Sequence, residues 1–261
     1  MTEQDVLVER RGPIGTVTLN RPARRNAVRY EGWRALAAAV GELGGDPAIR
    51  AVILRGAGEE AFSAGADITE FPTFRSDRES GARYHDAVAG ALAALGASPT
   101  PVIALIHGHC IGGGCELAVA CDLRLADEAA RFAIPSTRRG IILGVGELRA
   151  LRELVGLGAA KDIVLTGRTL DAAEALRIGL VNQVVPRAEL HATALALAER
   201  IAANIPLAVA ATKDLLGRIA RDEEAEAIEA AHAVYAAQAY ASEEYHEQVR
   251  AFIEKRPGGG K

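Results

Sequence analysis

The chain has 261 residues, of which 49% are hydrophobic and 25% are charged, and its formal net charge at pH 7 is −4. This length and apolar content predict a globular protein with one substantial core and exclude a mainly disordered chain. The small negative charge provides no basic field for nucleic acid or for an anionic membrane surface. No apolar run reaches the length of a membrane-spanning helix, so we expect no membrane partner.

The N-terminal residues and the cysteines indicate the compartment. Residues 2–5 are polar and partly acidic, and no apolar signal segment follows them, so we expect no secretion. The three cysteines, Cys110, Cys115 and Cys121, are an odd number and lack C-x-x-C spacing. They predict small buried side chains in a reducing compartment, with neither a disulfide nor a metal site. We therefore expect a cytoplasmic protein.

Strands and helices alternate in the first half of the chain. Short β-rich or continuously apolar segments predict strands, and apolar residues at helical spacing predict helices. Strands are predicted at residues 14–19, 51–54 and 101–106, and helices at residues 30–43 and 80–96. Residues 56–72 are predicted to form an irregular loop.

A glycine cluster at residues 112–114 follows and opens a short apolar helix at residues 115–121. Two short strands are predicted near residues 123–126 and 131–134. Helices dominate thereafter, with one strand-like interruption at residues 180–185. This order predicts an α/β core.

The last part of the chain predicts three or four helices and little else. Two apolar stripes recur there at helical spacing, one at Leu190, Ala194, Leu197 and Ile201 and one at Tyr245, Val249, Phe252 and Ile253. Both stripes need a surface to cover them, either the core or a neighbouring subunit. We therefore divide the chain into an α/β core at residues 1–186 and a helical region at residues 187–261.

Two segments rich in small residues are candidates for chemistry, at residues 61–68 and 108–118. In the second, glycines precede a helix whose first turn carries Glu116. Free backbone N–H groups and a helix N-terminus, with about half a positive charge, suit a negative charge developing on oxygen. Glu116, three residues beyond Gly113, is placed to carry a proton beside that oxygen. Alternatively, the glycines only permit tight packing and Glu116 only caps its helix.

Other motifs fail on spacing. A dinucleotide-binding turn requires glycine where Leu117 stands, and the Gly-Lys-Ser/Thr string of a phosphate-binding loop is missing from the sequence. Ser63 is a weak candidate nucleophile, because a serine-hydrolase elbow follows its strand directly and seven residues separate Leu54 from Phe62. The irregular spacing of the histidines favours structural roles over a metal triad, at His85, His107 and His109.

Seven ordered motifs together resemble the crotonase superfamily, which includes the enoyl-CoA hydratases and isomerases. They cover nearly the whole chain, at residues 17–22 with 26–27, 62–68, 112–118, 122–124, 169–176, 179–182 and 252–256. The resemblance implies a crotonase-like spiral of β-β-α units with a helical C-terminal oligomerisation region. It also implies a homotrimer or a dimer of trimers and an acyl-CoA thioester substrate, with no cofactor beyond the CoA moiety.

The resemblance also assigns roles to individual residues. The backbone N–H groups of Ala66 and Gly113 match the family's oxyanion hole, which stabilises a thioester enolate. The positions matching CoA contacts are Arg24, Arg25, Ala27, Ala64, Asp67 and Ile68, with Phe252 and Lys255 contributed by a neighbouring subunit.

One departure from the family changes the expected chemistry. Family hydratases use two glutamates, and the first matches Glu116, but Ser136 stands where the second is expected. A serine hydroxyl does not replace a carboxylate as a general base, and losing one acid/base group costs roughly 10²–10⁴ in rate. Glu147 opens the next predicted helix and is a candidate replacement; the alternative is an exposed charge at the helix start.

The sequence therefore predicts an acyl-CoA enzyme of the hydratase/isomerase group with weak hydration. Glu116 alone would suffice for double-bond isomerisation. The alternatives are an acyl-CoA decarboxylase or hydrolase on the same scaffold, or a non-catalytic acyl-CoA-binding protein. Methylmalonyl-CoA decarboxylase-like members carry His and Tyr where Ala66 and Leu143 stand, so that assignment is not supported.

Overall fold

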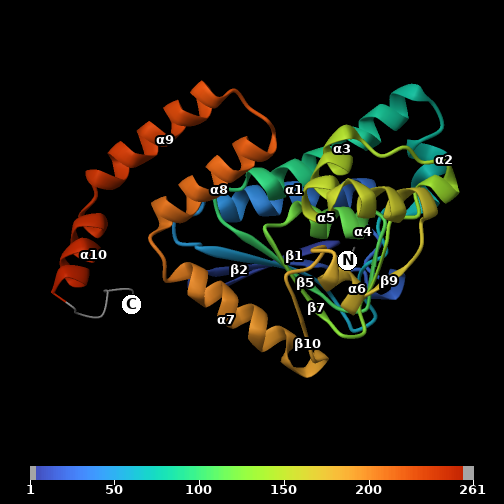
Figure 1. Ribbon diagram of the computed structural model, residues 1–261. Helices are drawn as coiled ribbons and strands as arrows, with labels where there is room; N and C mark the ends of the chain where they lie inside the picture. The colour runs from blue at the N-terminus through green and yellow to red at the C-terminus, as the bar shows by residue number, and fades with distance from the viewer. Residues whose placement is uncertain (1–3, 255–261) are drawn as a thin grey trace.

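Two β-sheets form the centre of the computed structural model, which describes residues 4–254 (Figure 1). The larger sheet has the strand order β1-β2-β3-β5-β7-β10, formed by Val6–Arg11, Ile14–Leu19, Ala51–Gly56, Val102–Ile106, Leu123–Asp127 and Gln183–Val185. Its β1 and β2 are antiparallel, and the other neighbours are parallel. The smaller sheet has the order β4-β6-β8-β9, formed by Ala61–Ser63, His109–Ile111, Arg131–Ala133 and Leu170–Asp171.

The chain passes repeatedly from the larger sheet to the smaller sheet and then into a helix. This happens in β3-β4-α3, in β5-β6-α4 and in β7-β8-α5, which confirms the predicted spiral of β-β-α units. The helices α1 to α6 are Tyr30–Gly45, Phe71–Phe74, Arg78–Ala97, Gly113–Ala120, Val145–Thr166 and Ala172–Arg177. Short 3₁₀ turns lie at Pro22–Arg24, Ile68–Glu70, Thr137–Arg139 and Arg187–Glu189.

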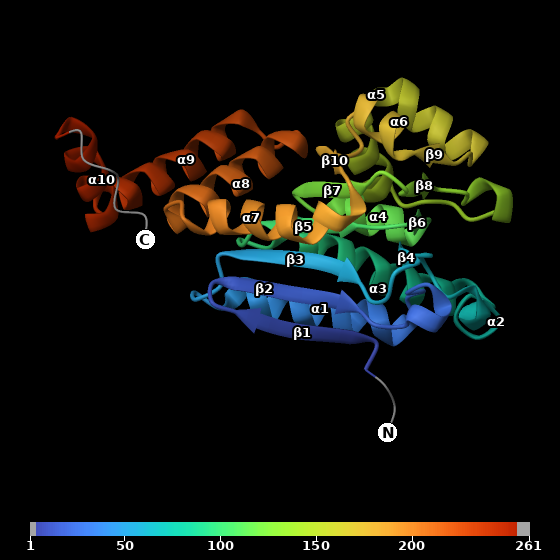
Figure 2. The same ribbon diagram turned by 90° about the horizontal axis from the view of Figure 1, so that it is seen from below.

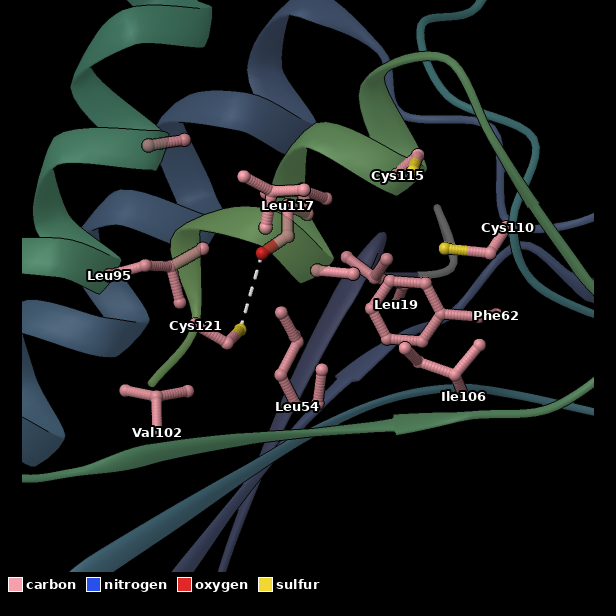
Figure 3. Packing of buried hydrophobic residues seen from close by; sticks show 14 of the residues in the cluster. Leu19, Leu54, Phe62, Leu95, Val102, Ile106, Cys110, Cys115, Leu117 and Cys121 are labelled. Atoms are coloured by element: carbon pink, nitrogen blue, oxygen red, sulfur yellow. Dashed lines mark hydrogen bonds between the residues drawn. The ribbon is translucent and has the colours of Figure 1, made fainter. Parts of the chain in front are cut away.

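The main core lies between the larger sheet and helices α1, α3 and α4. Its largest buried side chains include Trp33, Tyr84 and Phe62, all fully buried. Figure 3 shows Phe62 beside Ile106 and Cys110 beneath α4. The three cysteines are buried and free, as predicted, and the Cys121 thiol donates a hydrogen bond of 3.2 Å to the Leu117 carbonyl (Figure 3).

Helix α7, Leu190–Ala202, covers the opposite face of the larger sheet (Figure 2). Leu190 and Ala194 are buried there against Ile53 and Leu125, so the first predicted stripe packs on the core. The division at residue 187 stays a prediction, although α7 itself belongs to the packing of the sheet.

Helices α8, α9 and α10 follow; α8 packs at the edge of the core, where Lys213 pairs with Asp122 at 2.7 Å, and α9 and α10 lead away from the sheets (Figures 1 and 2). They span Pro206–Ala220, Ala225–Tyr240 and Glu243–Ile253. Large apolar side chains are exposed along them, at Leu216, Ile219, Val234, Tyr240, Val249, Phe252 and Ile253. Within residues 4–254, no single helix has the length and apolar content to cross a membrane, although a sharply bent pair, Arg187–Ala202 with Pro206–Ala220, meets that test.

The sequence prediction missed the shortest strands. Strands β4 and β6 have three residues each, and β4 lies inside the segment expected to be an irregular loop. Strand β1 was also missed, and the predicted strand at residues 180–185 is ordered as a strand only at Gln183–Val185. Three residues are too few to display a hydrophobic period, so pairing with neighbouring strands decides their conformation.

Candidate active site

A cavity of about 310 Å³ opens where the ends of the smaller sheet meet α2, α3, α4 and the start of α5. It brings together both segments singled out in the sequence, because β4 and β6 are neighbouring parallel strands. Its lining includes Ala66, Gly113, Glu116, Ser136 and Glu147. Residues far apart in the chain thus share one cavity.

Two backbone N–H groups lie side by side in this cavity. A Cβ atom at Gly113 would be 3.4 Å from the Ala66 nitrogen, and one at Gly65 would be 2.7 Å from the Gly113 nitrogen. Within residues 4–254 neither the Ala66 nor the Gly113 N–H donates a hydrogen bond, and Gly113 is the first residue of α4. Free amides at a helix N-terminus favour a negatively charged oxygen. The pair predicted as the oxyanion hole is therefore geometrically available.

Glycine is required where these two segments approach each other. Gly65 has φ +87°, in the region that favours glycine, and a Cβ there would lie 2.6 Å from the Ile111 carbonyl oxygen. At Gly113 a Cβ would lie 2.9 Å from Trp33 Cη2. The small-residue patterns in the sequence thus have a steric cause as well as a chemical one.

Glu116 lies one turn into α4 and lines the cavity. Burial raises the pKa of Glu116 to about 7; the Glu147 carboxylate adds to the rise and the Arg75 guanidinium opposes it. A carboxyl group that titrates near neutral pH is suited to give and take a proton. The surroundings of Glu116 therefore favour proton transfer over a role limited to capping the helix.

Ser136 and Glu147 both line the cavity. Ser136 is buried, and its hydroxyl oxygen is one of four buried side-chain polar atoms in residues 4–254 without a hydrogen-bond partner. Glu147 lies in the first turn of α5 and is half-buried rather than fully exposed. A Cβ at Gly144 would touch both the Glu147 carboxylate and His85 Cε1. The structure thus places a second carboxylate in the cavity, eleven residues beyond the serine.

The residues expected at the CoA site divide into three groups. Ala27, Ala64, Asp67 and Ile68 line the cavity, whereas Arg24 and Arg25 are exposed outside its lining. Phe252 is 86% exposed on α10, and Lys255 lies outside the described residues.

The Asp67 carboxylate is occupied within the fold. It accepts hydrogen bonds from Arg21 at 2.8 Å and from the Thr69 hydroxyl at 2.7 Å. Burial raises its pKa, but these hydrogen bonds outweigh burial and hold the pKa of Asp67 below its usual range. Asp67 thus fixes the loop that carries Ala66 and is unsuited to carry a proton at neutral pH.

The competing candidates are not arranged for catalysis. Ser63 is fully buried; its hydroxyl donates to the Asn26 carbonyl at 2.8 Å and accepts from the Gly65 N–H at 3.1 Å. Burial lowers the pKa of His107 to about 4, assisted by Arg187 and Arg55. Residues 4–254 contain no group of three His, Cys, Asp or Glu side chains that could hold a metal ion.

Several cavity residues were not identified from the sequence. Trp33, Phe71, Arg75 and Leu143 all contribute to its wall, and His85 lies there as well. Trp33 and Phe71 resemble ordinary core residues in the sequence, and Arg75 follows a four-residue helix without a motif. Only the packing of α1, α2 and α3 brings them to the cavity.

Comparison with known proteins gives the family of the chain. The enoyl-CoA hydratase/isomerase family profile matches residues 9–259. A short-chain-enoyl-CoA hydratase of Clostridium acetobutylicum is 37% identical over 256 residues, covering 98% of this chain and 97% of the relative. A crotonyl-CoA hydratase of Syntrophomonas wolfei is 34% identical, with the same shares covered.

Solved structures of similar proteins share the fold of this chain. An enoyl-CoA hydratase/carnithine racemase from Magnetospirillum magneticum has a TM-score of 0.89 and 39% identity, covering 100% of this chain and 96% of that one. An enoyl-CoA hydratase from Mycobacterium smegmatis has a TM-score of 0.91 and 33% identity, covering 99% of both chains. The chain is therefore an enzyme of the enoyl-CoA hydratase/isomerase family, the crotonase superfamily that its motifs resemble.

Proposed function

We propose that the chain binds an acyl-CoA thioester and stabilises its enolate between the N–H groups of Ala66 and Gly113. The observation that carries this proposal is the placement of two free backbone donors beside Glu116 in one cavity. A thioester carbonyl oxygen becomes negatively charged as the enolate forms, and donors aimed at that oxygen lower the barrier.

Hydration of a 2-enoyl-CoA is the reaction that uses both carboxylates. The oxygen of water bonds to the β carbon while Glu147 takes a proton from that water. The electron pair of the double bond moves into the thioester enolate, and Glu116 then gives its proton to the α carbon. The pKa of Glu116, raised to about 7 by burial, supports its role as the acid. The first turn of α5 favours the negative charge of Glu147.

Isomerisation of the double bond is the second candidate. Isomerisation needs one group that removes a proton from one carbon and returns it to another. Glu116 alone can perform both proton transfers. The presence of Ser136 in place of the family glutamate favours it. If Glu147 does not act on water, weak hydration and faster isomerisation are expected.

Phe252 and Lys255 complete the CoA site only if a neighbouring subunit provides them. The apolar side chains exposed on α8 to α10 support assembly into trimers, since Phe252 and Ile253 are 86% and 72% exposed in a single chain. We therefore include a homotrimer or a dimer of trimers in the proposal.

The test is a panel of acyl-CoA esters analysed by mass spectrometry after incubation with the protein. Gain of water reports hydration, loss of carbon dioxide reports decarboxylation, and free CoA reports hydrolysis; chromatography separates double-bond isomers. We expect hydration or isomerisation of crotonyl-CoA-like substrates, with loss of both in Glu116→Gln. Binding without any product would instead indicate a non-catalytic acyl-CoA-binding protein and contradict the proposal.

The role of Glu147 has its own comparison. Glu147→Gln should abolish hydration and spare isomerisation if Glu147 activates water. Glu153→Gln is the matched control, because Glu153 lies on the same helix but outside the cavity lining. Equal hydration rates in both variants would show that Glu147 is only a charge at the helix start.

A further inference from the structure

Arg75 places a positive charge on the wall of the same cavity. It follows α2 directly and lines the cavity together with Glu116 and Glu147. Its guanidinium carbon lies 4.4 Å from the ring centroid of Phe71 and 4.5 Å from that of Tyr84. Two aromatic rings thus hold the guanidinium in place.

No side chain or carbonyl within residues 4–254 accepts a hydrogen bond from the Arg75 guanidinium, and its buried Nε has no partner. The contrast with other enclosed arginines is clear. Arg124 donates to the Leu180 and Cys121 carbonyls, and Arg21 pairs with Asp67 at 2.8 Å. Leaving a buried N–H without an acceptor costs free energy, and ring faces do not satisfy the N–H groups in the guanidinium plane. Within residues 4–254 the fold thus provides no oxygen acceptor for this guanidinium.

The nearby carboxylates do not fill that role. Glu70, five residues earlier, accepts a hydrogen bond of 2.7 Å from the Tyr30 backbone N–H. Glu116 and Glu147 line the cavity, but neither forms an ion pair with Arg75 within 4.0 Å. Arg75 thus lines the cavity without a carboxylate partner among residues 4–254.

Arg75 is close to the reacting end of the cavity. Gly113 lies against Trp33, the Trp33 indole N–H donates to the Tyr84 hydroxyl at 3.3 Å, and the Tyr84 ring carries Arg75. The guanidinium also acts electrostatically on Glu116. The CoA phosphates, separated from the thioester by the whole pantetheine arm, are too far away to be its acceptor when the thioester lies at Gly113.

We propose that Arg75 is a carboxylate-binding subsite for the acyl group, and that the substrates are acyl-CoA thioesters carrying a second carboxylate on the acyl chain. This inference rests on the proposed function, because it places the thioester at Ala66 and Gly113. A guanidinium fork matches a carboxylate with two parallel hydrogen bonds. The apolar wall formed by Trp33, Phe71 and Leu143 contacts the carbon chain between the two ends.

The experiment compares ligands that differ only by the terminal carboxylate. Glutaryl-CoA is butyryl-CoA with a carboxylate on its last carbon, and both are saturated, so calorimetry measures binding without hydration. We expect the wild type to bind glutaryl-CoA at least tenfold more tightly. If Arg75 and the carboxylate form a hydrogen-bonded charge pair, Arg75→Met should weaken the binding of glutaryl-CoA about 10- to 100-fold. The affinity for butyryl-CoA should change less than threefold.

Arg78→Met is the matched control, because Arg78 is exposed at the start of α3 and outside the cavity lining. It should keep the wild-type preference. Arg75→Lys retains the charge without the fork and should keep only part of the preference, which also provides a readout if Arg75→Met does not fold. Equal affinity of the wild type for both ligands, or equal weakening of both by Arg75→Met, would overturn the inference.

Turnover separates this inference from the proposed function. Glutaconyl-CoA and crotonyl-CoA share the same conjugated double bond and differ by the terminal carboxylate. If the wild type converts neither but still prefers glutaryl-CoA, the proposed reaction fails and the subsite stands. If it converts crotonyl-CoA faster than glutaconyl-CoA, the reaction stands and the subsite fails.

Discussion

Replacing Glu116 by glutamine should make the protein more stable above neutral pH. The pKa of this carboxyl group rises from 4.5 to about 7, mainly through burial. The folded protein thus holds the proton more tightly than the unfolded chain does, so stability falls as pH rises from about 4.5 to about 7. Above that range both states are ionised and the cost stays constant, at about 3 kcal/mol.

Glutamine resembles the protonated form of Glu116 and avoids this cost. The free energy of unfolding, measured by urea denaturation, should therefore be similar for both proteins at pH 4.5. The gap should grow with pH, and Glu116→Gln should be more stable by about 3 kcal/mol at pH 8.5. Both proteins must be compared at one concentration, because assembly contributes to apparent stability.

An exposed glutamate on the surface of the protein, Glu79, provides the control. The Glu79 side chain is 85% exposed and paired with Arg83 on the surface of α3, so Glu79→Gln should not reproduce the pH-dependent gap. A Glu116→Gln difference that is the same at pH 4.5 and pH 8.5 would refute the reasoning. It would mean that Glu116 is not buried as the structure places it.

The remaining predictions concern catalysis and assembly. Gly113→Pro removes a backbone donor, whereas Gly113→Ala keeps it and adds the same contact with Trp33, so the proline variant should be about 10²–10³ slower than the alanine variant. Similar rates in the two would remove Gly113 from the oxyanion hole. Ser136→Glu places a carboxylate where the resemblance predicts the second glutamate and should raise crotonyl-CoA hydration; an unchanged rate would separate this position from water activation. The pH–rate profile of isomerisation should bend near pH 7, and Glu147→Gln, which spares that reaction, should move the bend to lower pH, because the Glu147 charge contributes to the raised pKa of Glu116. Light scattering should give a mass that is a multiple of three chains, and a monomer at micromolar concentration would contradict the shared CoA site.

The parts of the site formed by backbone were predictable from the sequence. Gly65 and Gly113 are required by local close approaches, and such requirements leave a pattern of small residues along the chain. Glu116 is only three residues from Gly113 on one helix, so its place beside the donors follows from helix geometry. The same local logic predicted strands β2, β3, β5 and β7 and helices α1 and α3, but not the six-residue strand β1.

The parts formed by packing were not predictable in this way. Arg75 reaches the cavity because α2, which precedes it, packs beside the cavity. The two aromatic rings that contact Arg75, those of Phe71 and Tyr84, come from different helices. In the sequence, Arg75 is one of 26 arginines with no spacing to distinguish it. For Glu147, helix position was predictable, but whether the side chain turns toward the cavity or toward solvent depends on the loop before α5.

The cavity concentrates ionisable groups where an ordinary core would have apolar ones. Glu116 is buried beside a second carboxylate, and Arg75 lies against two rings without an acceptor. Burial of Glu116 lowers the stability of the fold above neutral pH, and Arg75 keeps a buried Nε without an acceptor. An enolate oxygen would engage the free N–H groups, and a distal carboxylate would engage Arg75. The surrounding aromatic packing of Trp33, Phe71 and Tyr84 offsets this cost. Binding energy gained at Arg75, away from the reacting carbons, would then be available to hold the thioester against Ala66 and Gly113.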